Sequence, residues 1–146
     1  MRRLAAAAVV VAALAGAAWV WRAATAIPDG PDEVAWDKAA CGECRMHVGD
    51  KRFAAQLQTT DGQVLEFDDP GCLFHHLSKK QPPVHAIWFR HLAEDRWVRG
   101  DRAGFLPAEQ TPMGYGLGAV DLGAPGAIPL AQAVRQVAGK ESADAR

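Results

Sequence analysis

The sequence predicts a small α+β fold, in which short helices are segregated from antiparallel strands. Two β-like runs, residues 52–60 and 63–69, are joined at Asp61-Gly62, a pair that accepts the positive φ angles of a tight hairpin turn. Asp69 and Pro70 then suit the N-cap and the first position of a helix. A second helix is indicated near the C-terminus by apolar residues at helical spacing after Pro129: Leu130, Val134 and Val137.

The remaining elements are strands. The helix that starts at Asp69 ends before Pro82-Pro83, and residues 85–92 and 96–106 read as a second antiparallel pair. Residues 114–122 read as a glycine-rich strand. The sequence therefore predicts a ββαββ order with a further strand and a closing helix.

The N-terminus has the pattern of an export segment. Arg2 and Arg3 precede an uncharged apolar stretch from Leu4 to Trp21, intermediate between a signal h-region of about 7–15 residues and the roughly 20 residues of a membrane span. We expect a signal or signal-anchor segment over residues 1–26 that holds the domain at the periplasmic face of the inner membrane. The alternative is cleavage near Ala26, which would leave a soluble periplasmic domain.

The rest of the chain divides into a linker at residues 27–40, one domain at 41–139 and a polar tail at 140–146. The 146 residues have a formal net charge of −1, and the charged side chains of the leader are all arginines, so the remainder is more acidic. Nucleic acid is therefore an unsuitable partner. The chain has 3 cysteines, so in an oxidising compartment at least one thiol must be free, bound to metal or paired with another molecule.

Sulfur is concentrated in the stretch CGECRMHV, residues 41–48. If residues 44–48 are extended, Cys44 and Met46 project from the same face of the strand. A thiolate and a thioether together select monovalent copper over harder cations. The competing interpretation is that Met46 only fills a gap in the core.

Three other interpretations of the cysteines remain open. A structural zinc site would need four Cys or His ligands, and no second Cys-x-x-Cys follows. A thiol–disulfide redox protein using Cys41 and Cys44 would need a thioredoxin-like setting, which the preceding Pro/Asp-rich linker does not provide. A disulfide between Cys41 and Cys44 in a non-catalytic assembly module is the third. We expect no catalytic residues and no enzymatic activity.

Further candidate ligands lie elsewhere. Met113 stands in a glycine-rich turn, where it can close over a site or anchor the loop to the core. Cys72 and His76 are one helical turn apart and form a candidate ligand pair. Cys41 is a candidate third sulfur ligand.

Four blocks of the sequence, in order, resemble the NosL-type copper lipoproteins, which are accessory proteins of nitrous oxide reductase. The blocks are CGECRMHV with FAAQL after it, LEFDDPGCLFHHL, RWVRGDRAGFL and TPMGYGLGAVD. The resemblance implies a periplasmic α+β domain of two related β-rich halves that binds one Cu(I) through Cys44, Met46 and Met113. It also implies delivery of the ion to an exported copper enzyme, with an inner-membrane copper transporter as a further partner.

The sequence departs from this family in three ways. Members usually carry a lipobox cysteine at the end of the leader, and none is present here. Arg45 also stands where the middle residue of the family's Cys-Gly-Met pattern is expected. The chain of 146 residues is also short for the family. Nitrous oxide reductase is one expected client, and because of the short chain another exported copper enzyme, such as a terminal oxidase, is an alternative.

Overall fold

The structure, a computed structural model, describes residues 2–24, 27 and 29–144. Its helices are α1 (Arg2–Ala24), α2 (Pro70–Lys80) and α3 (Leu130–Asp144). Its strands are β1 (Ala55–Thr59), β2 (Val64–Phe67), β3 (Val84–Arg90), β4 (Trp97–Arg99), β5 (Ala103–Pro107), β6 (Leu117–Asp121) and β7 (Ile128–Pro129). The predicted α+β class is confirmed.

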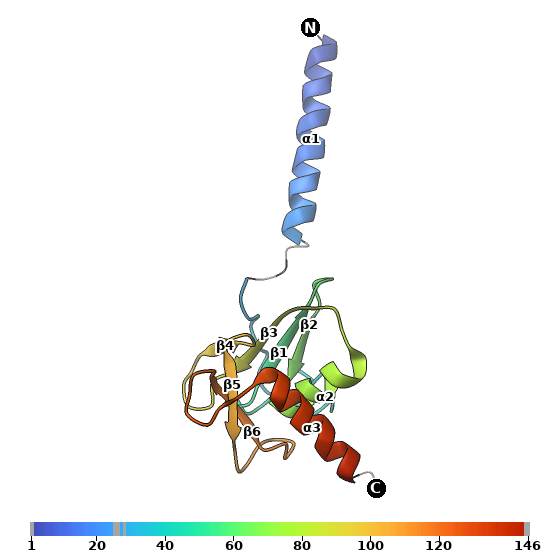
Figure 1. The fold of residues 1–146 in the computed structure, drawn as a ribbon. Helices are drawn as coiled ribbons and strands as arrows, with labels where there is room; N and C mark the ends of the chain where they lie inside the picture. Colours follow the sequence, from blue (N-terminus) through green and yellow to red (C-terminus); the bar gives the residue numbers. More distant parts are fainter. Residues whose placement is uncertain (1, 25–26, 28, 145–146) are drawn as a thin grey trace.

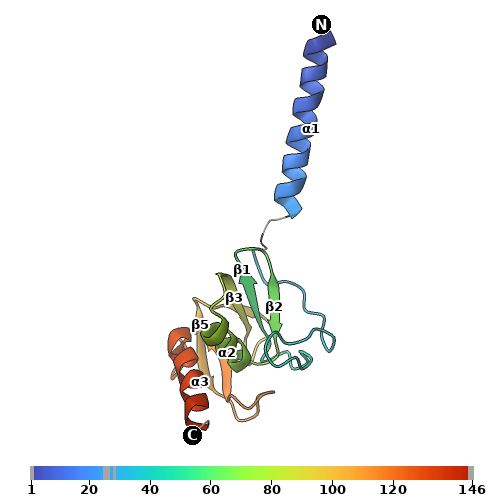
Figure 2. The same cartoon turned by 90° about the vertical axis from the view of Figure 1, so that its right-hand side faces the viewer.

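The strands form two antiparallel sheets. The first has 4 strands in the order β2-β1-β3-β4, and the second has 3 strands in the order β6-β5-β7. The hairpin expected at Asp61-Gly62 is present between β1 and β2, where Gly62 has a φ of 88°. Helices α2 and α3 pack against each other, and Figures 1 and 2 show them together on one side of the strands. The structure does not test whether the two halves are related, which stays a prediction.

The expected single strand over residues 96–106 is wrong. The chain turns after β4, where the Arg102 N–H donates to the Arg99 carbonyl at 2.8 Å, and β5 then enters the other sheet. At Gly100 an added Cβ would lie 3.1 Å from the Ile87 side chain, so the backbone passes close to β3 at this point. A break of three residues is enough to transfer the chain from one sheet to the other.

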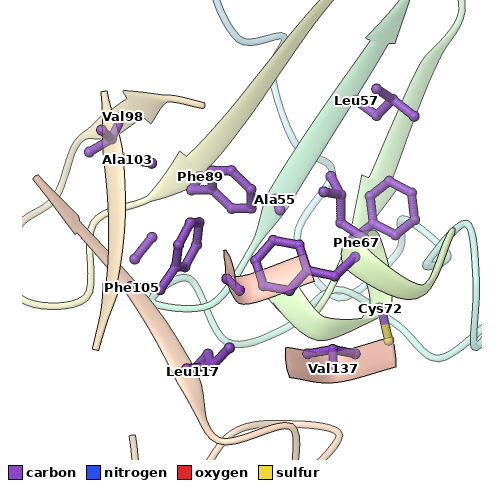
Figure 3. Packing of buried hydrophobic residues seen from close by; sticks show 14 of the residues in the cluster. Ala55, Leu57, Phe67, Cys72, Phe89, Val98, Ala103, Phe105, Leu117 and Val137 are labelled. Carbon is purple, nitrogen blue, oxygen red and sulfur yellow. The ribbon is translucent and has the colours of Figure 1, made fainter. Parts of the chain in front are cut away.

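Three phenylalanines join the two sheets to α2. Phe74 of α2, Phe89 of β3 and Phe105 of β5 are fully buried, with ring centroids 4.9–5.8 Å apart. Figure 3 shows Phe89 and Phe105 facing each other across the core. Aromatic pairs in tilted or edge-to-face arrangements contribute about 0.5–1.5 kcal/mol each beyond the area that they bury. This cluster therefore fixes α2, which carries part of the candidate site, against both sheets.

The C-terminal part of the segment expected as a linker, residues 27–40, packs onto the first sheet. Gln56 is buried and pairs with Asp32, accepting from its N–H at 2.7 Å and donating to its carbonyl at 2.8 Å. Gln58 is also buried and donates to the Gly30 carbonyl at 2.6 Å. Val34 then packs in a small cluster with Val48 and Ala54. The chain is thus attached to the domain from about residue 30 onward.

Helix α1 stands apart from the domain in Figure 1, and its side chains from Val11 to Arg22 are exposed. Among the residues that the structure describes, no helix has the length and apolar character needed to cross a membrane. The cleavage expected near Ala26 falls on a residue outside those that the structure describes. At the other end, α3 continues to Asp144, into the range expected as a polar tail.

Candidate metal centre

Four side chains converge at one end of α2. The Sγ atoms of Cys41, Cys44 and Cys72 and a carboxylate oxygen of Asp68 all lie within 4.8 Å of one another. Cys41, Asp68 and Cys72 are buried, while Cys44 is partly accessible. All three cysteines are free thiols. We call these four residues the thiol–carboxylate cluster.

The first two cysteines lie on a tight turn. The Cys41 N–H donates to the Met46 carbonyl at 2.8 Å, and the Arg45 N–H donates to the Cys41 carbonyl at 3.1 Å. Arg45 closes the turn in the left-handed region, with a φ of 66°. A bond of 2.7 Å from the Gly42 N–H to the Glu66 carbonyl attaches the turn to β2. The two thiols are therefore held against the end of that strand.

This turn corrects the expectation that residues 44–48 are extended. Cys44 belongs to the turn, and the positive φ of Arg45 interrupts the alternation that would have placed Cys44 and Met46 on one face. The same turn precedes no helix, so the thioredoxin-like setting is also missing. The positions of Cys44 and Met46 are therefore set by the turn and not by strand geometry.

The other two cluster residues sit where β2 passes into α2. Asp69 is the N-cap of α2, as expected, and its Oδ1 accepts from the Gly71 N–H at 2.8 Å. This cap places Cys72 in the first helical turn and Asp68 directly before the helix. The Asp68 Oδ1 lies 3.4 Å from the Cys44 Sγ. Asp68 was not expected as a ligand, although an acidic residue next to the N-cap of a helix whose first turn carries a cysteine is a signal that could have identified it.

The cluster favours a negative charge on Cys41. The Cys72 thiol donates to the Cys41 sulfur, and this bond, helped by the backbone of Asp68, Cys44 and Glu43, lowers the pKa of Cys41 to about 6 against the opposing effect of burial. The pKa of Cys72 is raised, first because its proton is held by Cys41 and then by burial. Burial raises the pKa of Cys44 to about 11. Among the described residues, no ion pair neutralises Asp68.

Met46 and Met113 lie outside this buried group. They are 59% and 40% exposed, so neither fills the core. Met46 and Asp68 line one pocket of about 390 Å³, together with Thr111 and Pro112, which immediately precede Met113. The Met113 N–H donates to the Asp69 Oδ2 at 3.0 Å and fixes the loop beside the cluster. We call Met46 and Met113 the methionine rim; their role as ligands stays a prediction.

His76 takes a different place from the one that the Cys72–His76 spacing predicts. Its Nδ1 lies 3.0 Å from the Glu43 Oε2, and its ring packs edge-on against Phe67 with centroids 5.3 Å apart. The cluster found among the described residues does not include it. Of the additional candidates, the structure therefore brings Cys41 and Cys72 to Cys44.

Similarity to known proteins is weak. No family model matches the sequence, and no curated protein matches it. Among solved structures, the chain is similar to the crystal structure of the copper chaperone NosL from Shewanella denitrificans, with 15% identity and a TM-score of 0.48, over 77% of this chain and 89% of that chain.

Proposed function

We propose that the domain binds one cuprous ion at the thiol–carboxylate cluster. The observation that carries this proposal is the convergence of three thiols and a carboxylate within 4.8 Å. The cluster favours a thiolate at Cys41, and among the described residues no ion pair neutralises the buried Asp68 beside it, so the site is suited to a cation. A soft cation bound by the three sulfurs would supply that charge.

The choice between copper and zinc depends on the methionine rim. Three thiolates and a carboxylate also suit tetrahedral zinc, because carboxylate oxygen is among the ligands that zinc accepts. Met46, however, lines the same pocket as Asp68. Met113 directly follows Thr111 and Pro112, which also line this pocket. Thioether sulfur suits Cu(I) and adds little to a zinc site. The two exposed methionines therefore favour copper.

Delivery of the ion, more than storage, fits this arrangement. The ion would be held among buried thiols, while exposed thioethers offer a second set of soft ligands at the surface, where another protein can reach them. The resemblance of the four sequence blocks supports an exported copper enzyme, such as nitrous oxide reductase, as the client and an inner-membrane copper transporter as a partner. The protein would then act as a non-enzymatic copper chaperone.

A titration with Cu(I) under reducing conditions, against a competing Cu(I) chelator, tests this proposal. We expect one equivalent per chain by native mass spectrometry, and zinc at equal concentration should not displace it. Stoichiometric zinc that Cu(I) cannot displace would replace the proposal with a structural zinc site. Absence of binding of either metal would remove the metal centre altogether.

A thiol–disulfide redox role is less compatible with the burial of the reactive sulfur. Cys41 has the lowered pKa that a nucleophilic thiol requires, but its side chain is 0% exposed. A disulfide substrate must reach the attacking sulfur directly. Reduction of a disulfide substrate by the metal-free protein, with an added dithiol as the reductant, would support that alternative if it were lost in Cys41→Ser.

The proposed location is the periplasmic face of the inner membrane, and the support is the leader sequence with Arg2, Arg3 and the apolar stretch after them. The intact mass of the protein recovered from membranes tests whether residues 1–26 are retained. A mature N-terminus at Ile27 in the soluble fraction would show cleavage instead.

A further inference from the structure

Glu43 lies between the two cysteines of the Cys41–Cys44 turn and points to α2. One of its carboxylate oxygens contacts the Nδ1 of His75, and the other lies 3.0 Å from the Nδ1 of His76. Glu43 is 17% exposed and each histidine side chain 11% exposed, so the three groups are largely shielded from water. A single side chain of the turn thus holds two consecutive residues of the helix.

Both contacts require that the histidine Nδ1 carries a hydrogen. An ionised carboxylate only accepts hydrogen bonds, so each Nδ1 must carry the hydrogen. Both Glu43 oxygens are then satisfied, and the two imidazoles are fixed in one tautomer. Hydrogen bonds to a charged group are roughly twice as strong as neutral ones, which favours a stiff connection.

This connection joins the two elements that carry the sulfur atoms. Cys41 and Cys44 lie on the turn, whereas Cys72 lies on α2, one helical turn before the histidines. The backbone bond from Gly42 attaches the turn to β2, not to the helix. Glu43 supplies a side-chain attachment between the turn and α2.

We propose that Glu43 is a positioning residue, which holds the Cys41–Cys44 turn against α2 so that the three thiols are assembled before the metal arrives. The effect on metal affinity rests on the proposed copper site, whereas the attachment of the turn does not. A site assembled in advance avoids the cost of ordering the turn when the ion binds. If Glu43 only stabilised the fold, its removal would not act through Cys72.

The first experiment needs no metal. Amide hydrogen exchange in Glu43→Ala is compared with wild type and with Glu33→Ala, a matched change at an exposed glutamate. We expect about tenfold faster exchange at the Arg45 N–H, which closes the turn, and unchanged exchange at Leu57 in β1. Unchanged exchange at Arg45 would overturn the proposal, and so would equal acceleration at both positions.

The second experiment measures Cu(I) affinity in a double-mutant cycle with Cys72→Ala. Glu43→Ala should weaken binding about 10- to 100-fold when Cys72 is present, the range typical of residues that orient metal ligands, and only slightly when Cys72 is absent. An equal loss in both backgrounds would show that Glu43 does not act through Cys72. If Glu43→Ala does not fold, Glu43→Gln replaces it, since its amide nitrogen cannot accept a hydrogen bond, and a smaller loss of the same sign is expected.

If the wild-type protein binds no Cu(I), the proposed function is wrong. The exchange experiment would still decide whether Glu43 fastens the turn to α2. The two failures are therefore distinguishable.

Discussion

The methionine rim adjoins the thiol–carboxylate cluster at the pocket that Met46 and Asp68 line, but the two groups differ in exposure and in charge. Cys41 and Cys72 are 0% and 1% exposed, whereas Met46 and Met113 are 59% and 40% exposed. The cluster contains a thiolate and a carboxylate, and the rim contains neutral thioethers. For the copper site proposed above, we therefore expect the cluster to determine how tightly an ion is held and the rim to determine how readily it is exchanged.

The elements that hold the cluster are also more firmly packed than the loop that carries Met113. Cys72 and Asp68 are positioned by β2 and by α2, which the phenylalanine core fixes against both sheets. Met113 stands in a loop with glycines at 114 and 116, both at positive φ, and its backbone is held to Asp69 by one hydrogen bond. Local opening is easiest where few packed contacts must be broken. Met113 can therefore move while the cluster stays intact.

The largest expected effect is the loss of a cluster thiol. Replacing Cys44 by serine removes a soft ligand and should weaken Cu(I) binding by roughly 100-fold or more, since a hydroxyl is a poor ligand for this ion. Competition with a Cu(I) chelator measures the change, with Leu122→Ala as the control outside the site. Full affinity in Cys44→Ser would contradict the assignment of the cluster.

The second prediction concerns the charge on Cys41. Its pKa of about 6 in the folded state lies below the ordinary 9.0, so the thiolate stabilises the folded protein above pH 9.0 and this contribution is lost as the pH falls through about 6. Thiolate absorbance of the metal-free protein should titrate near pH 6 and disappear in Cys41→Ser. In Cys72→Ala the main donor is removed, so the midpoint should move upward; an unmoved midpoint would mean that Cys72 does not hold the charge.

A moderate effect is expected for the rim. Met113→Ala should preserve one-to-one binding, weaken affinity by about tenfold or less and speed transfer to a stronger chelator, because one thioether ligand contributes less than a thiolate. Stopped-flow transfer measures the rate, with Leu122→Ala as a control at another exposed apolar residue. Identical affinity and transfer rate in Met113→Ala would remove Met113 from the site.

The smallest effect is expected from releasing the loop without altering any ligand. Asp69→Asn can keep the N-cap through its remaining oxygen, but its amide nitrogen cannot accept from the Met113 N–H. We expect at most about 1 kcal/mol of lost stability, the usual value of one such bond. Copper transfer should become a few-fold faster, as in Met113→Ala but more weakly. A transfer rate unchanged from wild type would show that this hydrogen bond does not control the loop.

Local chemistry made several elements predictable. The hairpin at Asp61-Gly62 and the cap at Asp69 depend on residues within four positions of one another, so their sequence signals do not need the rest of the fold. The C-terminal helix follows from apolar spacing in the same way, with Val137 buried as expected. Sulfur chemistry alone also identified Cys44 as a candidate ligand, with Cys41 and Cys72 as additional candidates.

Tertiary structure decided how these residues meet. Asp68 joins the site only because the end of β2 lies beside a turn 24 residues earlier in the chain, a contact that no local pattern encodes. Arg45 adopts a positive φ, which is uncommon for a non-glycine residue and cannot be predicted from its identity. Because of this φ, a turn forms where a Cys44–Met46 strand was expected. The sequence by itself determined which soft ligands are available and the local signals for turns and helices. Only long-range packing determined that three thiols and a carboxylate share one buried site, because that convergence requires segments distant in sequence to be fixed by a common core.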